Sequence, residues 1–171
     1  METFHIVHDF DTTPELFWEL FFLPEYNRSF YGSVGLTREV TQRSEANGAL
    51  EIQARYVSAR PLPDFVTRAL RGRRLGFSEA LIYRASEQRA VQTITPDFFQ
   101  KQVRFRGEIE VKALASGGIR RVYRGSLGVS VPILGRKVEQ ATLQEMQRTH
   151  DQAAEVTRAW LQKNHAWREE N

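Results

Sequence analysis

The last part of the chain constrains the fold most strongly, because it reads as one long helix with a single apolar stripe. From Gly135 onward, apolar and small residues recur every three or four positions. Such a helix needs an apolar surface to cover its stripe along the whole length, and a sheet that provides this surface has to curl around the helix. The stripe consists of Val138, Thr142, Met146, Thr149, Ala153, Val156 and Trp160.

The segment before this helix reads as a succession of strands joined by hairpin turns. Ala46-Asn47-Gly48 and Ser116-Gly117-Gly118 are typical turn sequences, since Asn and Gly tolerate a positive φ. Between the turns, apolar and polar residues alternate, and this alternation indicates half-buried strands. The predicted strands are 2–10, Leu36–Gln42, Leu50–Ser58, Leu75–Arg84, Ala90–Thr95, Gln102–Ala113 and Ile119–Val131.

Two short helices are expected between the first and second strands. Thr13 caps a helix that starts at Pro14 and is limited by Pro24, and a second helix spans about 25–31. Nine of the 19 aromatic residues (3 Trp, 5 Tyr and 11 Phe) precede Gly32, so these helices must cover an apolar surface. Runs of strands with helices segregated from them define the class α+β, here a curved antiparallel seven-stranded sheet wrapped around the long C-terminal helix.

Two glycines interrupt the apolar face of neighbouring strands. In residues 103–112, VRFRGEIEVK, Gly107 takes an inward position, and Gly125 does so in the next strand. A buried aliphatic side chain there would contribute about 1.5–3 kcal/mol, so a glycine indicates a sharp bend or a close approach. With the small Thr142 and Thr149 on the facing helix, we expect an unfilled volume above the glycines. The alternative is that aromatic side chains of the N-terminal helices fill this space.

Length and composition exclude several classes of protein. The 171 residues suffice for one domain, 1–171, with a single core. The apolar share is 41%, the charged share 26%, and no apolar run approaches the ~18 residues of a membrane span. The chain has no cysteine, which excludes disulfides, thiolate metal sites and cysteine nucleophiles. We expect a cytoplasmic protein without a secretory signal, and its net charge of only +3 does not indicate a nucleic-acid partner.

Glu79 is the acidic residue with the clearest chemical interest. It alternates in phase with Phe77 and Leu81, so it is expected to point inward. A buried carboxylate needs a cation or hydrogen bonds, and it can bind the polar end of a ligand or act as a general acid or base. The alternatives are a structural role or, if the opposite phase with Ser78 and Ala80 points inward, plain exposure.

The other candidate side chains are His8 and Arg121. His8 shares a strand face with Phe4 and Phe10, which is typical of a core histidine more often than of a base. Arg121 falls in the inward phase and either extends to solvent or anchors a carboxylate. His5 and His8 lie on opposite strand faces, and no HxH or HExxH spacing is present, so no metal site is expected. We assign no catalytic residue, since neither a G-x-S-x-G nucleophile motif nor a phosphate loop is found.

The order of elements resembles the START-like, polyketide-cyclase-like helix-grip superfamily. The matching motifs are TPELFWELF after the first strand, the turn-rich segment 62–83, F-R-G at 105–107, and VPILGRKVE at 131–139 before the long helix. The resemblance implies a hydrophobic pocket between the curved sheet and the C-terminal helix, used for lipids, sterols, polyketides or hormones. It implies catalysis in only some members.

The function expected from this resemblance is the binding or transport of a hydrophobic small molecule or lipid, without a cofactor, a metal or covalent chemistry. One alternative is a cyclase or dehydratase that uses Glu79 or His8, and another is a protein-interaction module with a filled core. The residues expected to line the ligand site are Phe77, Glu79, Leu81, Phe105, Gly107, Ile109, Tyr123, Gly125, Thr142, Met146 and Thr149.

A basic stretch lies between the third and fourth predicted strands. It contains Arg68, Arg71, Arg73 and Arg74. Such a stretch is either a solvated face or a contact to anionic lipid headgroups, where each cation near a membrane surface contributes about 1 kcal/mol.

Overall fold

The computed structural model describes residues 1–59, 67–68, 74–132 and 135–169. Its seven strands form one antiparallel sheet in the order β1-β7-β6-β5-β4-β3-β2. The strands are β1 (Glu2–Phe10), β2 (Leu36–Ala46), β3 (Ala49–Ser58), β4 (Gly76–Arg84), β5 (Arg89–Pro96), β6 (Val103–Ala113) and β7 (Ile119–Val129). The helices are α1 (Pro14–Phe22), α2 (Pro24–Ser33), α4 (Gly135–Glu169) and the 3₁₀ turn η1 (Ala85–Glu87).

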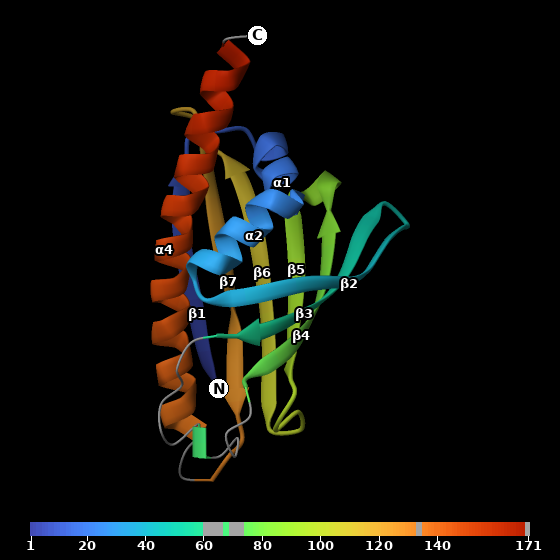
Figure 1. Ribbon diagram of the computed structural model, residues 1–171, viewed down its shortest axis with the longest axis vertical. Coiled ribbons are helices and arrows are strands. Elements are labelled where there is room, and N and C mark those ends of the chain that lie inside the picture. The colour runs from blue at the N-terminus through green and yellow to red at the C-terminus, as the bar shows by residue number, and fades with distance from the viewer. Residues whose placement is uncertain (60–66, 69–73, 133–134, 170–171) are drawn as a thin grey trace.

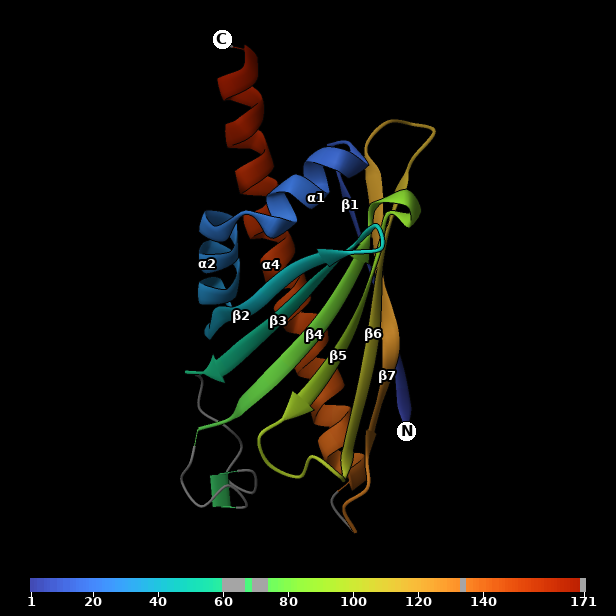
Figure 2. The same cartoon turned by 90° about the vertical axis from the view of Figure 1, so that its right-hand side faces the viewer.

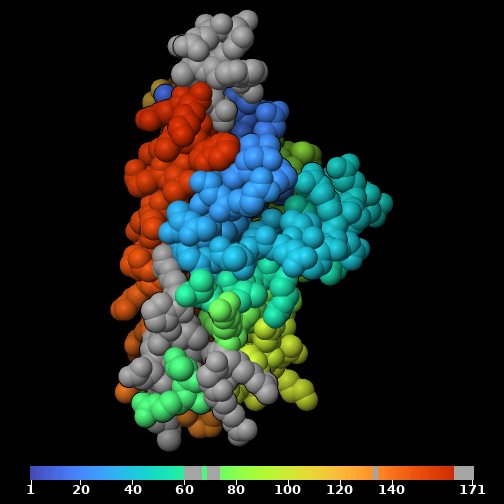
Figure 3. Space-filling model, viewed as in Figure 1, coloured from blue at the N-terminus to red at the C-terminus, as the bar shows by residue number. Residues whose placement is uncertain are grey.

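The α+β helix-grip architecture predicted from the sequence is confirmed. In the side view of Figure 2, α1, α2 and α4 lie on the same side of the curved sheet. The helix α4 runs along β1 and β7 and packs against α2, as Figure 1 also shows. The space-filling view shows α1 and α2 as a continuous surface between α4 and the β2–β3 hairpin (Figure 3). Two layers therefore enclose the core, with the sheet on one side and these helices on the other.

Local sequence signals account for the ends of the first elements. The Thr13 side chain accepts a hydrogen bond from the backbone N–H of Leu16 (3.3 Å), so it caps α1 as expected. Asn47 and Gly48 adopt φ of 52° and 72° in the β2–β3 turn, and Gly118 adopts 76° in the β6–β7 turn. These turns fix the antiparallel register of both hairpins.

The VP-x-x-G-x-x-x-E motif has a clear structural basis. Gly135 begins α4 so close to β7 that a Cβ added to it would lie 2.2 Å from the carbonyl oxygen of Val129. One turn later, the buried Glu139 carboxylate accepts a hydrogen bond from the backbone N–H of Val129 (2.7 Å), and this bond lowers the pKa of Glu139. The motif therefore ties the start of α4 to the end of β7.

The inward stripe of α4 differs from the predicted one. Of the predicted positions, Ala153 is fully buried and the others are half-buried. The deepest positions also include residues beside the predicted stripe, namely Glu139, Ala154, Thr157 and Leu161. The prediction missed Glu139 and Thr157 because they are polar, but each finds a partner: Val129 for Glu139 and the Tyr26 hydroxyl (2.8 Å) for Thr157.

The two glycines are cross-strand partners, but the space above them is filled. A Cβ added to Gly107 would lie 2.6 Å from Cε2 of Tyr123, and one added to Gly125 would lie 2.7 Å from Cζ of Phe4 and 2.1 Å from the carbonyl oxygen of Arg106. The expectation of an unfilled volume at these two positions is therefore wrong. The glycines instead make room for two aromatic rings whose centroids are 4.9 Å apart.

Only part of the basic stretch lies within the described residues. Arg68 and Arg74 are exposed, whereas Arg71 and Arg73 lie outside the described residues. Contact of this stretch with anionic lipid stays a prediction. Among the described residues, no helix combines the length and apolar character that a membrane crossing requires.

Alanine at the two glycines should separate a rigid obstacle from a movable one. Gly125→Ala meets backbone and should lower the free energy of unfolding by about 3 kcal/mol or more, whereas Gly107→Ala meets a side-chain ring and should cost roughly 1–3 kcal/mol. Gly128→Ala on the same strand is the control, because its Cβ would contact only Met1 at 3.7 Å. Urea unfolding measures the three values, and equal costs at Gly125 and Gly128 would contradict this account.

Candidate functional site

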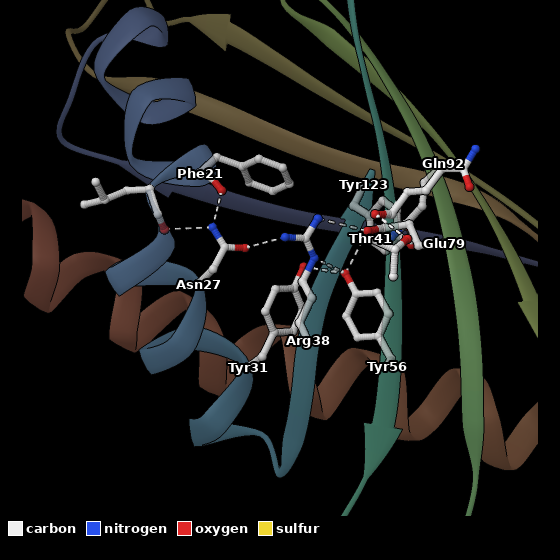
Figure 4. Close-up of polar contacts among 11 residues, drawn as sticks. Phe21, Asn27, Tyr31, Arg38, Thr41, Tyr56, Glu79, Gln92 and Tyr123 are labelled. Carbon is white, nitrogen blue, oxygen red and sulfur yellow. Dashed lines mark hydrogen bonds and ion pairs between the residues drawn. The ribbon is translucent and has the colours of Figure 1, made fainter. Parts of the chain in front are cut away.

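A chain of polar side chains crosses the concave face of the sheet (Figure 4). The Tyr123 hydroxyl on β7 donates to Oε1 of Gln92 on β5 (2.5 Å), and Nε2 of Gln92 donates to Oε1 of Glu79 on β4. Gly107 lies between Gln92 and Gly125 in the sheet register. Because Gly107 has no side chain, the Tyr123 ring can lie across β6 and reach Gln92.

The other carboxylate oxygen of Glu79 connects this row of polar side chains to α2 through hydrogen bonds. Tyr56 donates its hydroxyl hydrogen to Oε2 of Glu79 (2.8 Å), and Nη2 of Arg38 donates to the same oxygen (3.2 Å). Arg38 also donates through Nη1 to Oδ1 of Asn27 on α2 (3.3 Å), and the hydroxyls of Tyr56 and Tyr31 lie 3.1 Å apart. The side chains of Arg38 and Glu79 are only 10% and 1% exposed, so this is a buried ion pair whose hydrogen bonds are well provided.

A second polar cluster lies between β1, β7 and α4. Nη2 of the buried Arg121 donates to Nδ1 of His8 (2.7 Å), and Nε2 of His8 lies 2.8 Å from Oδ1 of Asp151. Since arginine can only donate, Nδ1 of His8 must be the acceptor, and the proton therefore sits on Nε2 and is donated to Asp151. Burial and the nearby Arg121 charge lower the pKa of His8, which agrees with a neutral ring.

His150 on α4 faces the same interior. Its ring lies 4.8 Å from the ring of Tyr123, and its Nδ1 is buried and finds no hydrogen-bond partner among the residues that the structure describes. Burial, reinforced by the Arg121 and His8 charges, lowers the pKa of His150 to about 3. The ring is therefore neutral at physiological pH.

Apolar side chains border these polar groups, and several of them are only half-buried. Five of them, from β5, β6, β7 and α4, pack against the buried core, and we refer to them as the apolar rim. The apolar rim consists of Ile94, Val103, Val129, Leu143 and Met146.

Most of the predicted site residues lie on the inner face of the sheet or at its boundary with α4. Glu79, Leu81, Phe105, Ile109 and Tyr123 are buried, and Gly107 is buried under the Tyr123 ring. Phe77 stacks on Tyr56 with a centroid distance of 4.8 Å. The half-buried members are Phe77, Gly125, Thr142, Met146 and Thr149.

Several polar partners escaped the sequence reasoning. Arg38 and Gln92 lie on strands whose alternation is mixed, and nothing in the sequence pairs them with Glu79. Tyr31 and Tyr56 were expected only as parts of elements, although aromatic residues with hydroxyls near a buried acid are natural partners. His150 directly follows Thr149, which the predicted stripe included. Had the predicted inward face of the helix been shifted by one residue, it would have included His150.

The structure holds the titratable side chains of His8, Tyr31 and Tyr123 in their neutral forms. Both ring nitrogens of His8 are engaged, which leaves this histidine without a free position for a general base. Burial, with the neighbouring Glu79 charge, raises the pKa of Tyr31 to about 12 and raises the pKa of Tyr123 as well, so both hydroxyls stay protonated. In the described part of the chain, no group of three or more His, Asp or Glu side chains could hold a metal ion.

The chain belongs to the family described as "Protein of unknown function (DUF2505)", whose match covers residues 5–161. A comparison with curated proteins found no match. Solved structures with the same fold include TTHA0849 from Thermus thermophilus, at 16% identity and a TM-score of 0.66, where the alignment covers 91% of this chain and 93% of that one. The chain therefore shares its fold with this structure.

Two further similar structures carry descriptive names. One is a START superfamily protein from Mycobacterium smegmatis, at 10% identity and a TM-score of 0.55, covering 94% of this chain and 97% of that one. The other is the Zhui aromatase/cyclase from Streptomyces sp. R1128, at 10% identity and a TM-score of 0.59, covering 92% and 95%. At these identities, the likeness shows a shared fold only.

The buried ion pair predicts a large effect of a single neutralisation. Arg38→Met leaves Glu79 buried without its counter-charge, so the free energy of unfolding should fall by roughly 3–5 kcal/mol. The double variant Arg38→Met/Glu79→Gln should be more stable than Arg38→Met alone. Arg28→Met is the control, since its ion pair with Glu25 is exposed and should contribute little. Urea unfolding that finds Arg38→Met as mild as Arg28→Met would contradict the assignment.

The neutral His150 predicts a dependence of stability on pH. Because its pKa falls from 6.5 to about 3 on folding, the unfolded chain binds the extra proton between these values, and stability present above pH 6.5 is lost as the pH falls. The loss should reach at most about 1.4 kcal/mol per pH unit. Urea unfolding at pH 7, 6 and 5 should show a weaker pH dependence for His150→Phe than for wild type. His5→Asn, on the exposed face of β1, should keep the wild-type dependence.

Proposed function

We propose that this chain binds a hydrophobic small molecule or lipid between the concave face of the sheet and α4, without covalent chemistry. The observation that carries the proposal is the apolar rim, because its side chains remain half-buried although they face the interior of the fold. Apolar surface left partly exposed in this way contributes about 25 cal/mol per Å² once a ligand covers it. The helix-grip resemblance supports the same location for a ligand.

The part of the interior beneath α1 and above the two glycines supports the proposal less, because aromatic rings fill it. Trp18 and Phe22 of α1 cover Tyr83 on β4 with ring distances of 4.4 Å and 5.1 Å, and Phe4 and Tyr123 occupy the space above the two glycines. This filling favours the interaction-module alternative for that half of the molecule. A ligand would therefore lie lower, along the apolar rim, with its polar end directed toward Tyr123 and His150.

The cyclase alternative is supported by one observation, the buried Glu79 in a fold that an aromatase/cyclase shares. Its carboxylate, however, already accepts hydrogen bonds from Arg38, Tyr56 and Gln92. These three donors occupy both carboxylate oxygens and hold the side chain in place. We therefore favour a structural and orienting role for Glu79.

Retained compounds and a blocking variant test the binding proposal. Native mass spectrometry of the purified chain, followed by organic extraction, should reveal a bound apolar compound. Titration with the neutral fluorophore N-phenyl-1-naphthylamine should show saturable binding that Met146→Trp weakens about tenfold or more, because the added ring occupies the rim. Gln144→Trp, at an exposed position of α4, should bind like wild type.

The outcome of this titration decides between the three functions. Absence of both a retained compound and saturable fluorophore binding would contradict ligand binding and favour the interaction module. Conversion of an extracted compound by wild type, but not by Glu79→Gln, would favour the enzyme.

A further inference from the structure

Arg121 is a buried cation to which the described residues offer no carboxylate as a direct ion-pair partner. The residue is 3% exposed, and the described part of the chain offers its guanidinium one hydrogen-bond acceptor, Nδ1 of His8, and no carboxylate within ion-pair distance. Nε of Arg121 is buried and has no partner among the described residues. The Asp151 carboxylate is reached only through the neutral His8 ring, and its side chain is 54% exposed. A buried cation compensated so indirectly is costly.

The surroundings of Arg121 supply a second unpartnered polar group. Arg121 and Tyr123 occupy successive inward positions of β7, and the His150 ring lies against the Tyr123 ring. Within the described ranges, Nδ1 of His150 is buried and has no partner either. The Arg121 charge helps to lower the pKa of His150, so the two groups lie within electrostatic reach of each other.

The contrast with the first polar cluster is informative. There, the buried Glu79 has a cation and two further donors from this chain. Tyr26, whose charge would act on Arg121, keeps its proton because burial raises its pKa. What the cluster around Arg121 lacks, in the part of the chain that the structure describes, is an anionic acceptor.

We propose that Arg121 and His150 form the head-group end of the binding site and that the ligand is an amphiphile with a carboxylate. The carboxylate accepts hydrogen bonds from Nε–H of Arg121 and from the His150 ring, while the apolar part extends along α4 from His150 toward Met146 of the apolar rim. One uncompensated cation matches the single charge of a carboxylate, whereas a phosphate monoester carries close to two. This inference rests on the proposed function and specifies its ligand.

Chain-matched probes test the inference on the wild-type protein. Isothermal titration calorimetry with decanoic acid, 1-decanol and decyl phosphate at pH 7.5 should give decanoic acid the highest affinity, about tenfold or more above decanol, as expected for a charge-assisted hydrogen bond in a buried site. Arg121→Met should lower the affinity for decanoic acid about tenfold or more and so remove the preference for the acid over decanol. Arg120→Met is the matched control, because Arg120 lies on the outer face and pairs with Asp9 (2.8 Å).

Each outcome distinguishes this inference from the proposed function. Equal affinities of wild type for decanoic acid and decanol would overturn the carboxylate assignment and leave ligand binding intact, whereas binding of none of the three probes would overturn both. A preference for decyl phosphate would replace the carboxylate by a phosphate. If Arg121→Met does not fold, the Nε–H resonance of Arg121 in wild type, assigned with Arg121→Lys, decides. It should shift with decanoic acid and not with decanol, and the absence of that difference would overturn the inference.

Discussion

The buried carboxylate of Glu79 is the constraint around which this half of the molecule is arranged. Glu79 is 3% exposed and has lost its hydration, so the fold has to replace water with fixed donors. The replacement comes from β2, β3 and β5 at once, through Arg38, Tyr56 and Gln92. Arg38 also donates a hydrogen bond to Asn27, and Asn27 in turn donates to the backbone carbonyl of Phe21 (2.7 Å). One buried charge thereby fixes α1 and α2 over the far half of the sheet.

The glycines belong to the same arrangement. Gly107 and Gly125 allow the rings of Tyr123 and Phe4 to lie directly over these strands, where any Cβ would collide with a ring or with backbone. This position brings the Tyr123 hydroxyl to Gln92 and its ring to His150. Tyr123 therefore connects the two polar clusters, one centred on Glu79 and the other on Arg121. The glycine at position 107, which the sequence suggested would leave an unfilled volume, instead leaves room for the Tyr123 side chain to cross β6.

The sequence was sufficient for the architecture and for individual orientations. Period-two alternation placed Glu79 and His8 on the inner face, and Asn-Gly and Gly-Gly turns set the hairpins, because these are local properties of the chain. The partners of those residues could not be derived, since Arg38 and Glu79 are 41 positions apart and His8 and Asp151 are 143 apart. Whether a glycine leaves a hollow or admits a ring likewise depends on which distant ring points there. Non-local contacts of this kind are invisible to a pattern read along one chain.

The polar clusters around Glu79 and Arg121 differ in how their charges are balanced, and this difference bears on which of them a ligand would contact. Around Glu79, the donors come from this chain, so the cluster is complete and stabilises the fold. Around Arg121, the described chain supplies a cation, a neutral histidine and a distant, half-solvated Asp151, so the balance is incomplete. The fold stabilises this buried cation by two interactions. Arg121 donates a hydrogen bond to His8, and its guanidinium carbon lies 5.4 Å from the centre of the Phe10 ring, a cation–π contact. A bound anion contributes most binding free energy beside a charge that the protein itself neutralises least. This favours Arg121 over Glu79 as the partner of a ligand's polar end.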